Sequence, residues 1–194
     1  MQHGIITISR TYGSGGRQIG IKLSQTLGIP YYDKEIIELC AKNSGVSANF
    51  FAQPEQAGSY LLRDFSASIL SELPLGDTVY LAQYVAIRTL AQKGPCVMVG
   101  RGAGAALKDF PSVLNVFICA DMETRKKRAI EEYGDSARKI EEHMAAIDKK
   151  RASYFKFYAG VDGKQMENYH LCIDSGHFGI DGAVSAIAAA YALL

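Results

Sequence analysis

The segment IITISRTYGSGGRQIGIKL, residues 5–23, decides the fold of this 194-residue chain. Its β-branched run at 5–8 predicts a buried strand, and the apolar residues Ile19 and Leu23 recur at the spacing of a helix. A stretch of small residues, 13–16, separates the two. We therefore predict a strand, a glycine loop and a helix in direct succession.

The glycine loop has the composition of a phosphate-binding loop. Where a strand enters a helix through small residues, unpaired backbone N–H groups and the positive end of the helix dipole converge on one point. The residues that we expect to bind nucleotide phosphates are Gly13, Ser14, Gly15, Gly16, Arg17 and Gln18. Ser14 adds a hydroxyl donor and Arg17 a positive charge. A glycine turn that merely joins a strand to a helix is the alternative, but the strand and helix on either side favour phosphate binding.

The loop departs from the usual pattern G-x-x-x-x-G-K-[ST] at three positions. Aligned over residues 11–18, it has Thr11 for the first glycine, Arg17 for the lysine and Gln18 for the hydroxyl residue. Arginine keeps the charge and binds phosphate through two nitrogens. Because glutamine is a poor magnesium ligand, we expect Mg²⁺ to be held by phosphate oxygens, water or another side chain.

The remaining apolar runs predict further strands of the same sheet. They lie at 30–33, 96–100, 113–119 and 171–173 and are separated by helical patterns. Near-continuous apolar strands between helices are typical of a parallel sheet that is covered on both faces. We predict an α/β fold of three layers, with about five parallel strands, in a single domain over 1–194. An irregular helical insert is expected at 44–76, and a long charged helical segment at 122–158.

Composition excludes several classes of function. Twenty-one basic and 20 acidic residues leave a net charge of +1, which gives no support to nucleic-acid or acidic-lipid binding. The four cysteines form no C-x-x-C pair, so we expect neither disulfides nor a zinc site, and a reducing cytoplasm fits best. No apolar stretch is long enough to span a bilayer. We expect no protein metal site and no membrane partner.

Several stretches along the chain carry a family resemblance. They are Ile8–Arg17 with its Gly-Gly-Arg variant, Leu27–Asp33, Val99–Gly102, Asn115–Asp121, Arg125–Arg128, Asp148–Tyr158 and Tyr169–Ser175. In these stretches the sequence resembles the cytidylate kinase-like family, within the P-loop nucleoside monophosphate kinases. The resemblance implies a P-loop kinase fold that uses ATP and Mg²⁺, with nucleotide and small-molecule substrates. It also implies a helical lid at about 135–165.

Phosphoryl transfer needs aligned substrates and converging positive charge rather than a protein nucleophile. The candidates for that charge are Arg17, Arg101 and Arg151. Arg101 follows a buried strand among small residues, and Arg151 has Asp148 three residues before it and an aromatic stripe after it. A surface ion pair beside a packed stripe is the alternative for Arg151. The expected acceptor-binding residues are Asp33, Lys34, Arg101 and Arg128, and Asp33 has the alternative role of capping the next helix.

Three positions depart from the family pattern and bear on the substrate. Lys34 and Leu39 stand where cytidylate kinases carry a serine and an arginine that read the acceptor nucleotide, and Gly102 replaces an aspartate. The leading hypothesis is ATP-dependent phosphoryl transfer to a nucleoside monophosphate, with cytidylate among the candidate acceptors. The alternatives are a non-catalytic nucleotide-binding or sensing module on the same fold and a kinase for a small non-nucleotide acceptor. The sequence does not indicate the oligomeric state.

Overall fold

The computed structural model describes residues 4–33, 39, 75–160, 163 and 165–194. The insert expected at 44–76 lies outside the described residues, except that 75 and 76 begin a helix. Lys34 also lies outside them.

Five parallel strands form the sheet, in the order β2-β3-β1-β4-β5. The strands are β1 (Ile5–Arg10), β2 (Tyr31–Tyr32), β3 (Cys96–Val99), β4 (Val113–Cys119) and β5 (Leu171–Asp174). Ile8 of β1 lies opposite Val99 on one side and Val116 on the other, so the carboxyl ends of the strands share one edge. This architecture confirms the predicted α/β fold.

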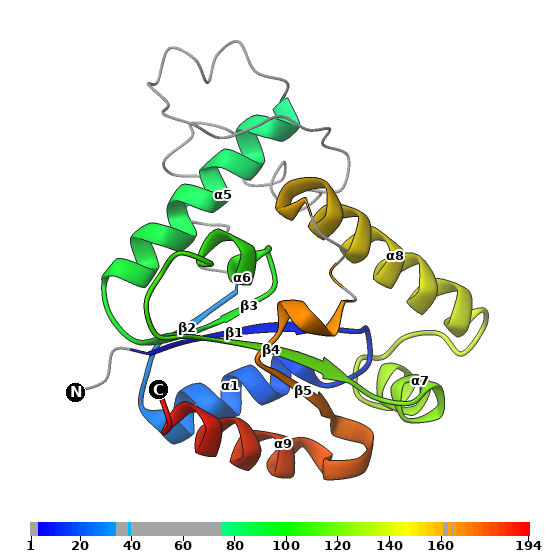
Figure 1. Cartoon of the computed structure of the whole chain (residues 1–194). Helices are drawn as coiled ribbons and strands as arrows, with labels where there is room; N and C mark the ends of the chain where they lie inside the picture. The colour runs from blue at the N-terminus through cyan, green and yellow to red at the C-terminus, as the bar shows by residue number, and fades with distance from the viewer. Residues whose placement is uncertain (1–3, 34–38, 40–74, 161–162, 164) are drawn as a thin grey trace.

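Helices cover both faces of the sheet (Figure 1). On one face lie α1 (Gly16–Leu27) and α9 (Ser175–Tyr191), which bury Ile19, Leu23 and Ile187 against the strands. On the other lie α5 (Leu75–Gln92) and the short α6 (Ala103–Ala106), which bury Ile87 and Ala106. Burying each large aliphatic side chain contributes about 1.5 to 3 kcal/mol. The two apolar cores therefore fix the edge at which the strands end.

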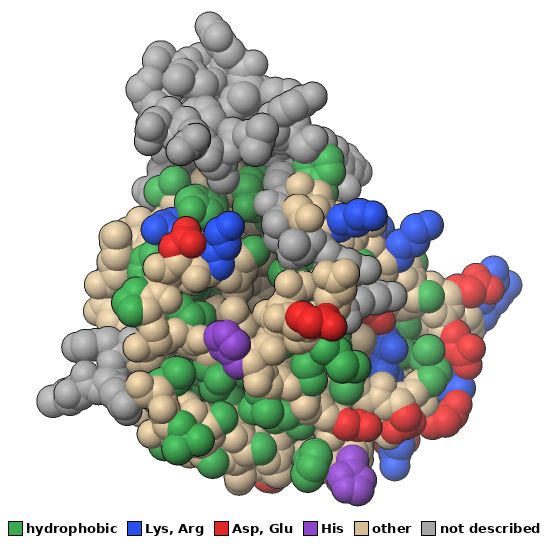
Figure 2. All heavy atoms as spheres, in the orientation of Figure 1, with side chains coloured by type: hydrophobic (Ala, Val, Ile, Leu, Met, Phe, Trp, Pro, Cys, Tyr) green, Lys and Arg blue, Asp and Glu red, His purple; other side chains and the backbone are tan. Residues whose placement is uncertain are grey.

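The charged helical segment expected at 122–158 forms two helices, α7 (Met122–Glu131) and α8 (Ile140–Ala159). The connection includes Gly134 at φ 76° and Lys139 at φ 59°, conformations that interrupt a helix. Lys126 of α7 pairs with Glu123 at 2.7 Å and with Glu141 at 2.9 Å. Basic and acidic side chains are intermixed at this end of the molecule (Figure 2), as expected for a solvated helix face. After α8 the chain forms a short 3₁₀ turn (Met166–Asn168) before β5.

None of the helices in the described ranges has the length and apolar character to cross a membrane.

Candidate functional site

The glycine loop joins β1 to α1 in a conformation that requires glycine at two positions. Gly13 and Gly15 both have φ of 77°, and Gly15 is the N-cap of α1. A Cβ on Gly13 would lie 2.5 Å from the carbonyl oxygen of Arg125, and one on Gly15 would overlap the side chain of Ile180. Backbone strain and close packing therefore both exclude side chains here.

Ser14 holds the loop together from within. Its side chain is fully buried, and its hydroxyl donates to the Thr11 carbonyl at 2.9 Å. Its own carbonyl accepts a hydrogen bond of 2.5 Å from the Ser175 hydroxyl of α9. The structure thus uses the Ser14 hydroxyl inside the loop and does not direct it toward a cleft.

Two arginines of α7 fasten the loop from the other side. Arg125 Nε donates to the Tyr12 carbonyl at 2.6 Å, and Arg128 Nη1 donates to the Gly13 carbonyl at 2.8 Å. Both side chains are about nine-tenths buried. Sequence analysis placed Arg128 among the acceptor-binding residues, whereas the structure places it against the glycine loop.

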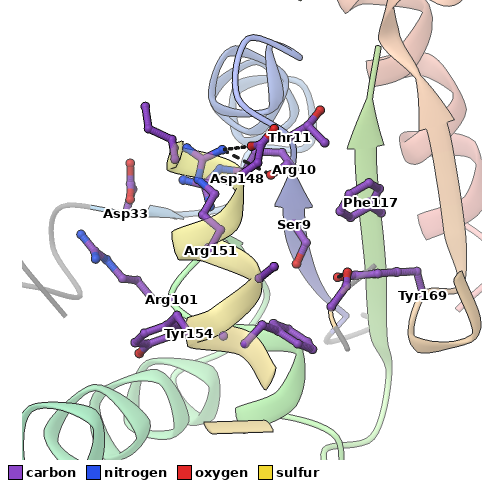
Figure 3. Close-up of a pocket in the computed structure, with 16 residues that line it drawn as sticks. Ser9, Arg10, Thr11, Asp33, Arg101, Phe117, Asp148, Arg151, Tyr154 and Tyr169 are labelled. Carbon is purple, nitrogen blue, oxygen red and sulfur yellow. Dashed lines mark hydrogen bonds and ion pairs between the residues drawn. The ribbon is translucent and has the colours of Figure 1, made fainter. Parts of the chain in front are cut away.

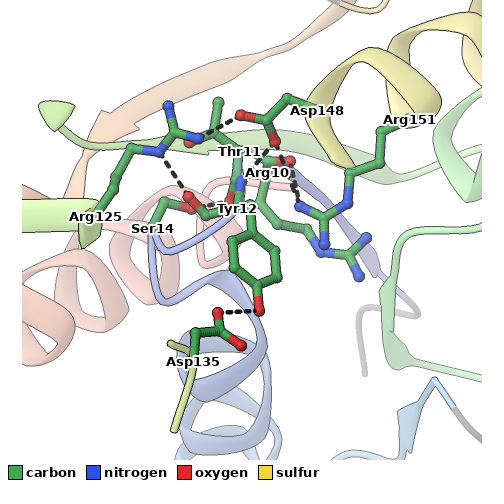
Figure 4. A network of polar contacts seen from close by, with 8 residues as sticks. All are labelled: Arg10, Thr11, Tyr12, Ser14, Arg125, Asp135, Asp148 and Arg151. Carbon is green, nitrogen blue, oxygen red and sulfur yellow. Dashed lines mark hydrogen bonds and ion pairs between the residues drawn. The ribbon is translucent and has the colours of Figure 1, made fainter. Parts of the chain in front are cut away.

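Asp148 of α8 connects that helix to the loop (Figure 4). Its carboxylate accepts a hydrogen bond of 2.7 Å from the backbone N–H of Tyr12 and forms an ion pair with Arg125. It also lies 3.8 Å from the guanidinium of Arg151, the i,i+3 pair expected from the sequence. Tyr12 in turn donates its hydroxyl to Asp135 at 2.7 Å. Burial and then this hydrogen bond raise the pKa of Tyr12 to about 12.

The segment after α7 covers the outer side of the loop. The Tyr133 ring packs edge-on against the ring of Tyr12, with the two ring centroids 5.7 Å apart. Gln18 Nε2 donates to Glu132 at 2.6 Å, whereas Gln18 Oε1 is buried and has no hydrogen-bond partner among the described residues. In this conformation, the Asp148 carboxylate therefore occupies the Tyr12 N–H at the start of the loop.

A cleft of about 570 Å³ lies at the carboxyl edge of the sheet, beside the first residue of the loop (Figure 3). Its polar lining includes Arg10, Thr11, Asp33, Arg101 and Arg151. Its other lining residues include the rings of Phe117, Tyr154, Phe155 and Tyr169. A cleft with cationic and aromatic sides has the chemistry to bind an anionic group joined to an apolar or ring-shaped one.

The structure unites some of the predicted site residues and separates others. Asp33, Arg101 and Arg151 line the cleft, whereas residues 13–18 do not. The Arg17 side chain is 68% exposed, and its Nε lies 3.6 Å from the Asp33 carboxylate. Arg17 therefore reaches the rim of the cleft only through Asp33.

Arg10 is the residue of the cleft that sequence reasoning missed. It ends β1, and its guanidinium lies so close to Gly100 that a Cβ at that position would overlap it. Burial and then the nearby charge of Arg151 lower the pKa of Arg10 to about 10. Burial also lowers the pKa of Arg151. One signal was available in the sequence: a charged residue placed directly between a buried strand and a glycine loop.

No cluster of three or more carboxylate, histidine or cysteine ligands occurs in the part of the chain that the structure describes. Mg²⁺ in phosphate-transfer sites is bound by one or two carboxylates together with substrate oxygens. The Asp33 carboxylate in the cleft fits that kind of coordination.

Comparisons with known proteins agree with this architecture. A cytidylate kinase from Methanothrix thermoacetophila is 26% identical over 97% of this chain and 99% of its own length. The crystal structure of an uncharacterized protein from Eubacterium ventriosum has a TM-score of 0.75 at 27% identity, covering 97% of this chain and 98% of that one. Shikimate kinase from Bacteroides thetaiotaomicron shares the fold, with a TM-score of 0.58 at 11% identity over 96% of this chain and 97% of its own. The model of the cytidylate kinase-like family matches residues 5–177, and the chain belongs to that family.

Proposed function

We propose that this protein is an ATP-dependent kinase that transfers a phosphoryl group to a nucleoside monophosphate. The observation that carries the proposal is the convergence of Arg10, Arg101 and Arg151 on one cleft beside the glycine loop. Three cations at close range repel one another, and burial adds to that cost for Arg10 and Arg151. A bound polyanion relieves both costs, and the carboxyl edge of a parallel sheet is where such ligands bind.

The chemistry asked of these residues is positioning and charge neutralisation. The backbone amides of the loop at 13–16 would hold the phosphates of ATP, with Arg128 fixing the shape of the loop through the Gly13 carbonyl. Asp33 and Arg101 would position the acceptor, and Arg151 would neutralise charge that develops on the transferring group. We assign the lid to the region of 135–165, since α8 carries both Arg151 and Asp148.

ATP binding at the start of the loop would require the Tyr12 N–H to exchange its partner. This N–H now donates to Asp148 of α8. Asp148 lies in the region that we assign to the lid, so opening of this region would free the donor.

The magnesium ion would arrive with the nucleotide. Asp33 of the cleft is the side chain whose oxygen atoms would contact it or its water molecules. When bound, Mg²⁺ would neutralise phosphate charge and align the phosphoryl group. Asp33 would orient the acceptor whether or not it touches the ion.

The aromatic side of the cleft supports an acceptor with a ring. Tyr154, Phe155 and Tyr169 offer surfaces on which a base can stack. The test is a coupled assay of ADP release with CMP, dCMP, UMP, AMP and GMP as acceptors, together with calorimetry of ATP–Mg²⁺ binding. We expect ATP binding and turnover with at least one pyrimidine monophosphate. A wild-type protein without ATP affinity would refute the proposal.

The side-chain contacts of the loop favour a second candidate, a nucleotide-binding module that does not transfer phosphate. Gln18 donates to Glu132 instead of presenting a hydroxyl, and the Tyr12 N–H donates to Asp148. That candidate predicts ATP binding without ADP release for every acceptor, including small alcohols such as shikimate. Turnover with any acceptor excludes it, and turnover with shikimate alone would assign a non-nucleotide substrate.

A further inference from the structure

Gly16 is the first residue of α1, and the side chain of Arg10 fills the space beside it. A Cβ added to Gly16 would lie 2.8 Å from Arg10 Cβ, 3.0 Å from its Cγ and 3.6 Å from its Cδ. A side chain at position 16 would therefore occupy the same space as the side chain at position 10. Only one of the two positions can supply a long side chain there.

The space shared by positions 10 and 16 is the space that the lysine of the usual phosphate-binding loop would occupy. In the pattern G-x-x-x-x-G-K-[ST], the lysine directly follows the second glycine and reaches the phosphates. With Gly15 as that second glycine, the pattern begins at residue 10, and Gly16 takes the lysine position. The helix supports this alignment, because Gly15 is the N-cap and α1 begins at Gly16. Arg17 then falls on the hydroxyl position, one residue beyond the lysine.

We propose that Arg10 replaces the missing lysine and is the phosphate-binding cation of this loop, whereas Arg17 is not. The proposal rests on the kinase function proposed above and names the residue that performs its central contact. The side chain leaves β1, passes Gly16 and ends against Gly100 in the cleft. In the usual loop pattern the positively charged residue lies at the start of the helix, whereas in this chain it lies at the end of the strand β1. Its charged group nevertheless lies beside the loop.

The free donors of Arg10 support this assignment. Its guanidinium forms no hydrogen bond with any residue in the described ranges, although five N–H donors are available. Asp33 is the carboxylate whose charge acts on it, opposed by the charges of Arg151 and Arg101. Asp148, the other carboxylate of the cleft, already binds Arg125 and the Tyr12 amide. The cleft therefore retains an excess of positive charge that suits a phosphate dianion.

Arg17 lacks these properties. Its side chain is 68% exposed, its Nε is paired with Asp33, and it does not line the cleft. Exposed ion pairs of this kind contribute little, because solvent screens the two charges. Arg17 is therefore the matched control: an arginine of the same loop with the same formal charge.

The experiment compares the wild type with Arg10→Met and Arg17→Met, since methionine keeps length without charge. Tripolyphosphate is the probe for anion binding by calorimetry, and the acceptor assay above measures kcat/KM. We expect Arg10→Met to weaken tripolyphosphate binding by about 10- to 100-fold, the loss of a charged hydrogen-bonding group. Arg17→Met should stay within about threefold of the wild type. Thermal melts establish that both variants fold.

A swap tests the shared space directly. Gly16→Lys alone forces its Cβ into the Arg10 side chain, so we expect it to lower both stability and tripolyphosphate affinity. Combining it with Arg10→Gly empties that space and rebuilds the usual loop, and the double variant should recover affinity to within about tenfold of the wild type.

The outcomes separate this inference from the kinase proposal. Normal binding by Arg10→Met together with a large loss in Arg17→Met overturns the assignment of Arg10 and leaves the kinase proposal intact. Tripolyphosphate binding that depends on Arg10, without ADP release for any acceptor, overturns the kinase proposal alone. A wild type that binds neither ATP nor tripolyphosphate overturns both.

Discussion

Asp148 accepts a 2.7 Å hydrogen bond from the backbone N–H of Tyr12, 136 residues away in the sequence. The same carboxylate pairs with Arg125, whose Nε donates to the Tyr12 carbonyl. Both backbone polar groups of one loop residue are thereby tied to the two helices α7 and α8. The side chain of Asp148 is only 17% exposed, so its charge interacts at reduced screening.

We expect Asp148→Asn to destabilise the fold by about 2 to 3 kcal/mol, because the buried Arg125 loses its carboxylate. Urea denaturation at pH 7 measures the change. The matched control is Asp181→Asn, whose carboxylate pairs with Lys22 at 2.5 Å but is 83% exposed. That variant should change stability by less than about 0.5 kcal/mol. Equal effects of the two substitutions would show that the Asp148 network adds nothing beyond a surface ion pair.

Arg10→Met should make the protein more stable while it weakens anion binding. The lowered pKa of Arg10, about 10, means that the native state disfavours the charged form relative to the unfolded chain. At every pH below that value the native protein carries this penalty, which methionine removes. We expect a gain of about 1 to 2 kcal/mol at pH 7, or about 2 to 6 °C in melting temperature. Scanning calorimetry without phosphate checks it, and a lower melting temperature for the variant would contradict it.

Much of the fold was predictable because buried parallel strands leave a plain signal. The runs at 5–8, 96–100 and 113–119 are almost entirely apolar, and each forms a strand of the parallel sheet. The helical segment at 122–158 is divided where Gly134 stands next to Asp135 and Ser136, a composition typical of turns.

The site was less predictable than the fold, because it depends on which side chains fill which spaces. Motif alignment drew attention to Arg17, yet the structure exposes Arg17 and brings Arg10 into the cleft. Arg128 was expected near the acceptor and instead holds the Gly13 carbonyl. The role of Arg128 follows from the contact between α7 and the glycine loop. These two segments lie more than 100 residues apart in the sequence, so no local sequence pattern indicates that they meet.

Tyr12→Phe should alter the dependence of stability on alkaline pH. Burial and the hydrogen bond to Asp135 raise the pKa of Tyr12 from 10.0 to about 12, so the native state favours the neutral phenol. This contribution is complete below pH 10 and is lost as pH rises from 10 through 12, when the unfolded chain ionises first. Because phenylalanine does not titrate, the Tyr12→Phe variant does not lose this contribution to its stability as the pH rises.

We therefore expect the free energy of unfolding of the wild type to exceed that of Tyr12→Phe by about 1 kcal/mol at pH 8, the contribution of one hydrogen bond. At pH 11 this difference between the two proteins should be smaller by about 1 kcal/mol. Urea denaturation at the two pH values measures it. If the difference is the same at pH 8 and pH 11, the Tyr12 phenol does not titrate differently in the native and unfolded states.

Gly13→Ala should damage the loop far more than the same change at another glycine of similar φ. Gly13 has φ of 77°, and a Cβ there would lie 2.5 Å from the Arg125 carbonyl oxygen, a backbone atom that cannot turn aside. Gly28, the C-cap of α1, has φ of 65°, and a Cβ added there would meet nothing within 4 Å. Gly28→Ala thus measures backbone strain alone, about 1 kcal/mol, whereas Gly13→Ala adds a steric clash and should cost about 3 kcal/mol or more.

Since that clash pushes the loop away from α7, ATP–Mg²⁺ affinity should fall in Gly13→Ala and stay unchanged in Gly28→Ala. Equal melting temperatures for the two variants would show that the loop does not pack against Arg125 as the structure describes.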